Sequence, residues 1–183
     1  MSHASERLSV TAPSPHQIVL SRAFAAPRHL VFAALTQPDL LVRWHGAQGW
    51  NLVECEVDLR PGGAWRFVSA GPGGETMGMS GAYLEVAPPG RLVHTEAFDG
   101  WDEGHAVVTT RLDERDGRTT MTTTVRYPSQ RLRDAMLAVT RRLDRHLGGP
   151  ANADLDGPRR SLYVQTTRGA RGTHKARGLA RPE

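Results

Sequence analysis

The hydrophobic period changes at Pro128, and this change constrains the fold more than any other feature of the sequence. Before Pro128, short segments alternate apolar and polar residues, and each ends in a turn rich in Gly, Pro or Asp. After it, apolar residues recur at steps of three and four as far as Leu147. Alternation predicts β-strands and the longer period predicts a helix. The sequence therefore predicts a meander of antiparallel strands followed by one long C-terminal helix.

The segments before the meander complete the predicted order. Residues 17–24 alternate like a strand, and Pro27 suits the first position of a helix. Pro38 ends that helix and opens a second, very short one, while Ser129 is placed to cap the long helix. We expect an α+β fold in which a curved antiparallel sheet of about six or seven strands wraps around the C-terminal helix. The two short helices follow the first strand.

An antiparallel sheet with one apolar face needs a cover, and the C-terminal helix is the only predicted element long enough to provide it. Because a twisted sheet curls around a single helix, the two cannot pack fully against each other. Gaps of this kind between sheet and helix are natural small-molecule sites. We therefore expect a cavity between the sheet and the helix.

The stretch "VDLRPGGAWRF", residues 57–67, raises the question of a phosphate site. A phosphate loop leads its glycines into a helix N-terminus and usually carries a lysine. Here the glycines lead into a strand and no lysine is present. Gly62 and Gly63 therefore predict a tight turn, since glycine accepts positive φ. Trp65 and Phe67 lie two residues apart and share one face of the strand.

Charge and cysteine content define the expected domain limits and surroundings. We expect a flexible leader at residues 1–15, a folded domain at 16–149 and a disordered basic tail at 150–183. The tail carries the whole net charge of +4, so the domain has no field for a specific nucleic acid. The single cysteine, Cys55, excludes an internal disulfide and fits a cytoplasmic protein. No apolar run is long enough to span a membrane.

Four motifs follow one another along the chain: "FAAPRHLVFAALTQPDLLVRW", "VDLRPGGAWRFV", "SGAYLEVAPPGRLVHTEAF" and "TTMTTTVRYPSQRLRDAML". Together they resemble the SRPBCC (START-like) superfamily, in the branch named after the activator of heat-shock-protein ATPase, the Aha1-like branch. The resemblance runs from about His16 to Leu147 and implies a helix-grip fold around a hydrophobic cavity. The superfamily includes lipid carriers, aromatic cyclases, hormone receptors and co-chaperone domains. His45 departs from the family pattern, which has a second tryptophan at this point.

The residues expected to line the cavity are large and apolar, and they come from the strands and from the C-terminal helix. The alternative is that they form an ordinary core. The candidates are Trp44, Trp65, Phe67, Met79, Tyr83, Phe98, Trp101, Met136 and Val139.

Three polar residues are weaker candidates for catalysis. His94 and Glu96 lie two apart on one strand, as an acid–base pair or two metal ligands would, although a solvated strand face is the favoured interpretation. His45 lies beside the presumed mouth of the cavity, where it could hold a polar group of a ligand, but a surface imidazole is the favoured interpretation. No cofactor and no metal ion are expected. The favoured function is binding of a hydrophobic or aromatic small molecule. A cyclase- or dehydratase-like enzyme and a co-chaperone-like module are the alternatives, with a chaperone or a second copy of the chain as further partners.

Overall fold

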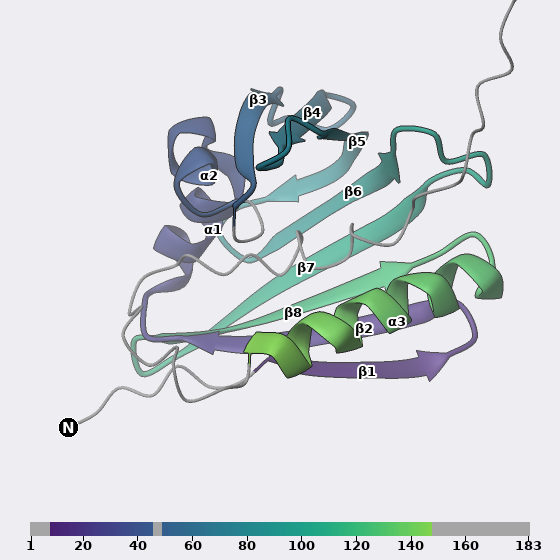
Figure 1. The fold of residues 1–183 in the computed structure, drawn as a ribbon. Coiled ribbons are helices and arrows are strands. Elements are labelled where there is room, and N and C mark those ends of the chain that lie inside the picture. Colours follow the sequence, from purple (N-terminus) through teal and green to yellow (C-terminus); the bar gives the residue numbers. More distant parts are fainter. Residues whose placement is uncertain (1–7, 46–48, 148–183) are drawn as a thin grey trace, which may run out of the picture.

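The computed structural model describes residues 8–45 and 49–147, which form a single antiparallel sheet with three helices (Figure 1). The eight strands lie in the order β1-β2-β8-β7-β6-β5-β4-β3. Every neighbouring pair is antiparallel, which confirms the predicted α+β class. The elements are β1 (Ser9–Ser14), β2 (Gln17–Phe24), α1 (Arg28–Thr36), α2 (Pro38–Trp44), β3 (Asn51–Val57), β4 (Ala64–Ala70), β5 (Thr76–Ala87), β6 (Arg91–Phe98), β7 (Ala106–Arg115), β8 (Arg118–Arg126) and α3 (Gln130–Leu147).

Six strands, β3 to β8, follow one another in the sheet as they do in the chain, as the meander pattern predicts. Strand β2 does not lie beside β3, the next strand in the chain. It pairs instead with β8 over its whole length, from Gln17 opposite Arg126 to Phe24 opposite Thr119. The N-terminal part of the domain is therefore fixed to the last strand of the meander.

The first strand corrects one prediction. The leader expected at residues 1–15 is wrong from Ser9 onward, because Ser9–Ser14 pairs with β2 as a hairpin. Val10 lies opposite Leu20 and packs, with Leu8 and Ala12, against the hydrophobic core. This burial stabilises an edge strand that contains Pro13. Residues 1–7 and the predicted tail at 150–183 lie outside the described residues.

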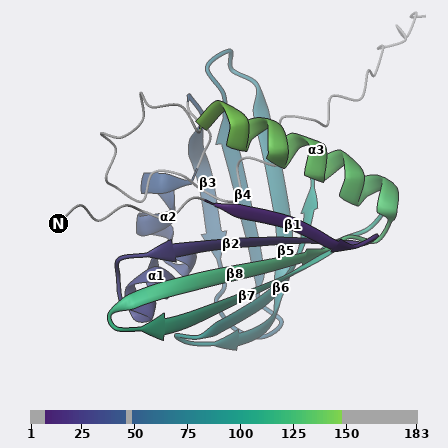
Figure 2. The same cartoon turned by 90° about the horizontal axis from the view of Figure 1, so that it is seen from below.

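One face of the sheet carries the core, and we call it the inner face. Helix α1 buries Val31 and Phe32 there, and α3 buries Met136 and Leu137. Figure 2 shows α3 lying across the curved sheet, with α1 and α2 elsewhere along it. Helix α3 contacts β1 and β2, and α2 contacts β3. Because Met136 and Leu137 belong to the core, α3 packs on the inner face of the sheet, as the fold prediction requires.

The start of α3 is fixed as predicted. The hydroxyl of Ser129 accepts a hydrogen bond of 3.1 Å from the backbone N–H of Leu132, which is the N-cap interaction. Thr140 lies on the buried side of the helix and donates its hydroxyl to the carbonyl of Met136. This internal bond satisfies a polar group that faces the core.

Candidate functional site

The turn between β3 and β4 brings an aromatic pair onto the inner face. Gly62 has a φ of 81° and its N–H donates to the carbonyl of Tyr83 at 2.7 Å. A Cβ on Gly63 would lie 2.0 Å from the carbonyl oxygen of Asp58, so the turn closes too tightly for a side chain. The glycines therefore join two strands, which confirms the predicted turn. Trp65, just beyond it, is buried in the core.

An aromatic row crosses the inner face from β4 to β6. Phe67 lies opposite Met79, and Met79 lies opposite Phe98. The rings of Trp65 and Phe67 are 4.9 Å apart between centroids. The row continues beyond β6, because the ring of Trp101 packs 5.0 Å from Phe98. The residues predicted on separate strands are thus brought into one continuous surface.

His94 and Glu96 point inward, not into solvent. They are 8% and 4% exposed. The His94 ring makes an edge contact with Trp65 at 5.4 Å and lies 6.1 Å from the ring of Tyr83. The solvated strand face that would explain them is therefore excluded. Leu92 and Phe98 lie on the same face of β6 as His94 and Glu96. These two apolar neighbours were the sequence signal that this face of the strand is buried.

His45 is also buried, at the C-terminal end of α2. It is 5% exposed, and its ring lies 5.1 Å from Phe67 in an edge arrangement. The backbone N–H of His45 closes the helix by donating to the carbonyl of Leu41. The expected surface imidazole is therefore wrong, because α2 packs on β3 and turns this side chain toward the aromatic row.

Burial controls the protonation of these groups. It lowers the pKa of His45 to about 4 and that of His94 to about 4, so both rings are neutral near pH 7. Burial also raises the pKa of the Tyr83 hydroxyl. Tyr127, which sequence reasoning missed, has its pKa raised by burial and then by the charge of Glu96. Tyr127 lies two residues after the buried Val125 and so shares its side of the chain, which was the sequence signal that Tyr127 faces the core.

Two of these buried residues have nitrogen atoms without a hydrogen-bond partner among the described residues. They are His45, at both Nδ1 and Nε2, and Trp65, at Nε1. Buried polar atoms normally have a partner, and one without it costs about 1–3 kcal/mol. The inner face therefore contains a polar area within the aromatic row.

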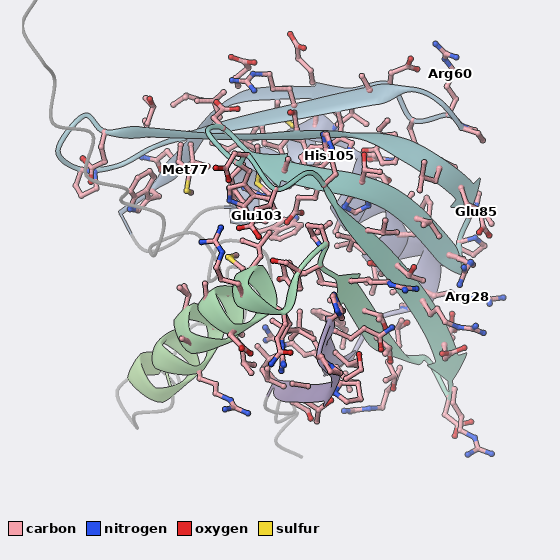
Figure 3. The ribbon with its side chains drawn as sticks, turned by 90° about the vertical axis from the view of Figure 1, so that its right-hand side faces the viewer. Arg28, Arg60, Met77, Glu85, Glu103 and His105 are labelled. Carbon is pink, nitrogen blue, oxygen red and sulfur yellow. The ribbon has the colours of Figure 1, made fainter. Side chains whose placement is uncertain are left out.

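A cleft of about 250 Å³ lies between α3 and the loop that joins β6 to β7. Ligand pockets are typically about 300–1,000 Å³, so this cleft lies just below that range. One wall is the loop and the other is α3. Figure 3 shows Glu103, on the loop, beside the N-terminal end of α3. The lining residues are Gly100, Trp101, Asp102, Glu103, Arg131, Leu132, Ala135, Met136 and Val139.

A larger and more open hollow of about 610 Å³ lies elsewhere on the sheet. Most of its lining residues alternate with the inner-face positions and belong to the outer face. Arg66 at its rim is held by Asp99 at 3.0 Å and by Glu54 at 3.1 Å. This hollow therefore lies apart from the predicted position between sheet and helix. Its lining is Glu56, Ala64, Trp65, Arg66, Ser80, Gly81, Ala82, Thr95 and His105.

The nine predicted wall residues fall into three sets. Three of them, Trp101, Met136 and Val139, line the cleft. Five belong to or pack against the core under it: Trp65, Phe67, Met79, Tyr83 and Phe98. Trp44 is used differently, because its indole N–H donates to the carbonyl of Ala34 at 2.8 Å and joins α2 to α1.

Within residues 8–45 and 49–147, no group of three or more His, Cys, Asp or Glu side chains is placed to hold a metal ion. No helix in that part of the chain is long and apolar enough to cross a membrane.

A curved antiparallel sheet that grips a C-terminal helix, with a cleft beside that helix, defines the helix-grip class of the SRPBCC superfamily. Residues 25–146 match the family model described as activator of Hsp90 ATPase homolog 1-like protein. The chain belongs to this family.

Solved structures of the same fold support this assignment. A protein from Rhodobacter sphaeroides is 34% identical, with a TM-score of 0.69, and the match covers 76% of this chain and 91% of that one. A protein from Nitrosomonas europaea is 26% identical, with a TM-score of 0.62, over 78% of this chain and 91% of its own. A protein from Arthrobacter aurescens, 22% identical over 79% and 86%, has a TM-score of 0.65 and shows the fold alone. No curated protein matches the chain.

Proposed function

We propose that this protein binds a small hydrophobic or aromatic molecule between the inner face of the sheet and α3. The observation that carries the proposal is the cleft of about 250 Å³ that Trp101, Met136 and Val139 line. Trp101 packs on Phe98, so one wall of the cleft rests against the aromatic row of the inner face. The apolar side chains on both walls favour a ring-shaped ligand, because aromatic rings pack well against one another, while Asp102, Glu103 and Arg131 add charged groups to the lining.

Ala135 on α3 allows a direct test. It lines the cleft, whereas Ala138 lies on the same helix, is exposed and is not part of the lining. Ala135→Trp should fill the cleft and weaken binding of the neutral fluorescent probe N-phenyl-1-naphthylamine by about tenfold or more, the equivalent of about 1.4 kcal/mol. The measurement is a fluorescence titration of the folded protein.

Ala138→Trp is the matched control and should bind the probe as the wild type does. Circular dichroism shows whether both variants keep the native fold. Equal binding by the two variants, or binding only by the unfolded chain, would remove the cleft from the proposal.

A second candidate function is catalysis at the same site, and the inward position of His94 and Glu96 favours it. The low pKa of His94 leaves a neutral base, and Glu96 supplies a carboxyl group on the same face of the strand. A cyclase- or dehydratase-like reaction needs such groups inside an apolar cavity. The test is mass spectrometry of a metabolite extract after incubation with the wild type or with Glu96→Gln. A product formed only by the wild type supports catalysis.

The family description keeps a co-chaperone role as a third candidate, since its name refers to activation of the Hsp90 ATPase. The measurement is the ATPase rate of Hsp90 with and without the protein. A faster rate supports this role, and an unchanged rate removes it.

A further inference from the structure

The charged groups that line the cleft beside α3 do not balance one another. Asp102 and Glu103 come from the loop that joins β6 to β7, and Arg131 comes from the first turn of α3. The lining therefore holds two carboxylates and one guanidinium, an excess of one negative charge. A ligand that enters the cleft is affected most by the charge that the protein itself leaves unpaired.

Arg131 and Glu103 are already paired with each other. The guanidinium of Arg131 donates to the carboxylate of Glu103, which also accepts the hydroxyl of Ser129 at 2.5 Å. Glu103 thereby places a negative charge at the N-terminal end of α3, where a helix carries a partial positive charge (Figure 3). The guanidinium and the helix end, the two features of the cleft that attract an anion, are both occupied by Glu103.

Asp102 is the unpaired charge of the lining. It is exposed and makes no hydrogen bond or ion pair with another residue of the ranges 8–45 and 49–147. It follows Trp101 in the loop, and Trp101 lines the same cleft. A carboxylate attracts cations, and so does the face of an indole ring. The free charge and the aromatic residue beside it therefore favour the same kind of ligand.

We propose that the cleft selects hydrophobic amines, which are cations near pH 7, over neutral and anionic molecules of the same shape. The apolar side chains that α3 contributes to the lining hold the hydrocarbon part, and Asp102 and Trp101 bind the ammonium group. The inference rests on the proposed function, because it names the chemical class of the molecule that enters beside α3.

Three probes with one ring system test this selection: 1-naphthylmethylamine, 1-methylnaphthalene and 1-naphthoate. At pH 7 they are a cation, a neutral molecule and an anion. Their affinities for the full chain follow from displacement of bound N-phenyl-1-naphthylamine, measured by its fluorescence. We expect the amine to bind about three- to tenfold more tightly than methylnaphthalene, as one exposed ion pair and one cation–π contact allow. We expect 1-naphthoate to bind most weakly.

Asp102→Asn removes the charge and keeps the shape of the side chain. It should reduce the advantage of the amine over methylnaphthalene to about twofold or less, while methylnaphthalene binds as before. Asp113→Asn, at an exposed position of β7 outside the lining, changes the net charge equally and should keep the full advantage. Sodium chloride at about 1 M should also reduce the advantage in the wild type, because salt screens exposed charges. This measurement needs no variant and decides the matter if Asp102→Asn fails to fold.

The outcomes separate the two proposals. If N-phenyl-1-naphthylamine does not bind the folded protein, the proposed binding function fails. If it binds but the amine displaces it no better than methylnaphthalene does, or 1-naphthoate displaces it best, the selection of amines is wrong while the binding function stands. An advantage of the amine that persists in Asp102→Asn, or at high salt, also overturns the inference.

Discussion

The carboxylate of Glu103 accepts a hydrogen bond of 2.5 Å from the hydroxyl of Ser129. Glu103 also accepts a hydrogen bond from the guanidinium of Arg131, in the first turn of α3. The same Ser129 hydroxyl caps the helix by accepting from the N–H of Leu132. One side chain of the β6–β7 loop is therefore bonded to the start of the helix that forms the opposite wall of the cleft.

Ser129→Ala should lower the free energy of unfolding by about 1–2 kcal/mol, because it removes the helix cap as well as the bond to Glu103. Urea denaturation followed by circular dichroism measures the change. Ser9→Ala, at an exposed position on the edge strand, is the control and should change stability by less than about 0.5 kcal/mol. Equal effects of the two substitutions would show that the cap and the loop contact contribute nothing.

Acid should destabilise the protein through its buried imidazoles. His45 and His94 each have a folded-state pKa of about 4 against 6.5 for a free side chain. Between those values the unfolded chain binds more protons than the folded one, so the free energy of unfolding falls as the pH falls from 6.5 toward 4. A difference of this size corresponds to about 3 kcal/mol for each ring.

His45→Leu should remove roughly half of that pH-dependent loss, as measured by urea denaturation at pH 7 and pH 5. His105→Asn, at an exposed position, should keep the full loss. An unchanged pH dependence in His45→Leu would show that this ring is protonated to the same extent in the folded and unfolded states.

Gly81→Ala should destabilise the sheet strongly. A Cβ at Gly81 would lie 1.8 Å from the carbonyl oxygen of Thr95 and 2.8 Å from Nε1 of Trp65, so β5 or β6 would have to shift. We expect a loss of about 2–3 kcal/mol in the free energy of unfolding. At Gly90 the nearest atom is a side-chain nitrogen of Arg28 at 3.7 Å, and Gly90→Ala should be tolerated. Thermal unfolding of the two variants gives the comparison, and similar melting temperatures would contradict the prediction.

Cys55 should react slowly with thiol reagents while the protein is folded. It is half-buried and burial raises the pKa of its thiol, so less of the reactive thiolate is present. The rate of modification by 5,5′-dithiobis(2-nitrobenzoate) at pH 8 should rise when denaturant unfolds the chain. A folded protein that reacts as fast as the unfolded one would show an exposed, ionised thiol.

The sequence was sufficient to predict the meander, the helix pair and the covering helix, because each rests on a local period or a proline. It missed β1, where Val10 and Ala12 alternate but Pro13 and the serines weaken the pattern. The stability of that strand comes from contacts with distant core residues, which no local pattern contains.

The site was predicted less well, since it depends on which face of a strand is covered. Alternation predicted that His94 and Glu96 share one face of their strand, but it did not decide whether that face meets solvent or the core. Leu92 and Phe98 on the same face were the indication that it meets the core. The burial of His45 was not predicted. The burial of His45 depends on how α2 packs against β3, and this packing is set by the whole fold and not by a local pattern.

The pairing of β2 with β8 has a consequence for synthesis of the protein. The residues of β2 leave the ribosome early, yet their partner strand ends at Arg126, near the end of the domain. Until β8 has emerged, Ile18 and Leu20 have no neighbouring strand on that side and depend on the β1 hairpin alone. A nascent chain arrested before Arg118 should therefore expose these residues to chaperones, and completion of the sheet is expected only after translation has passed β8.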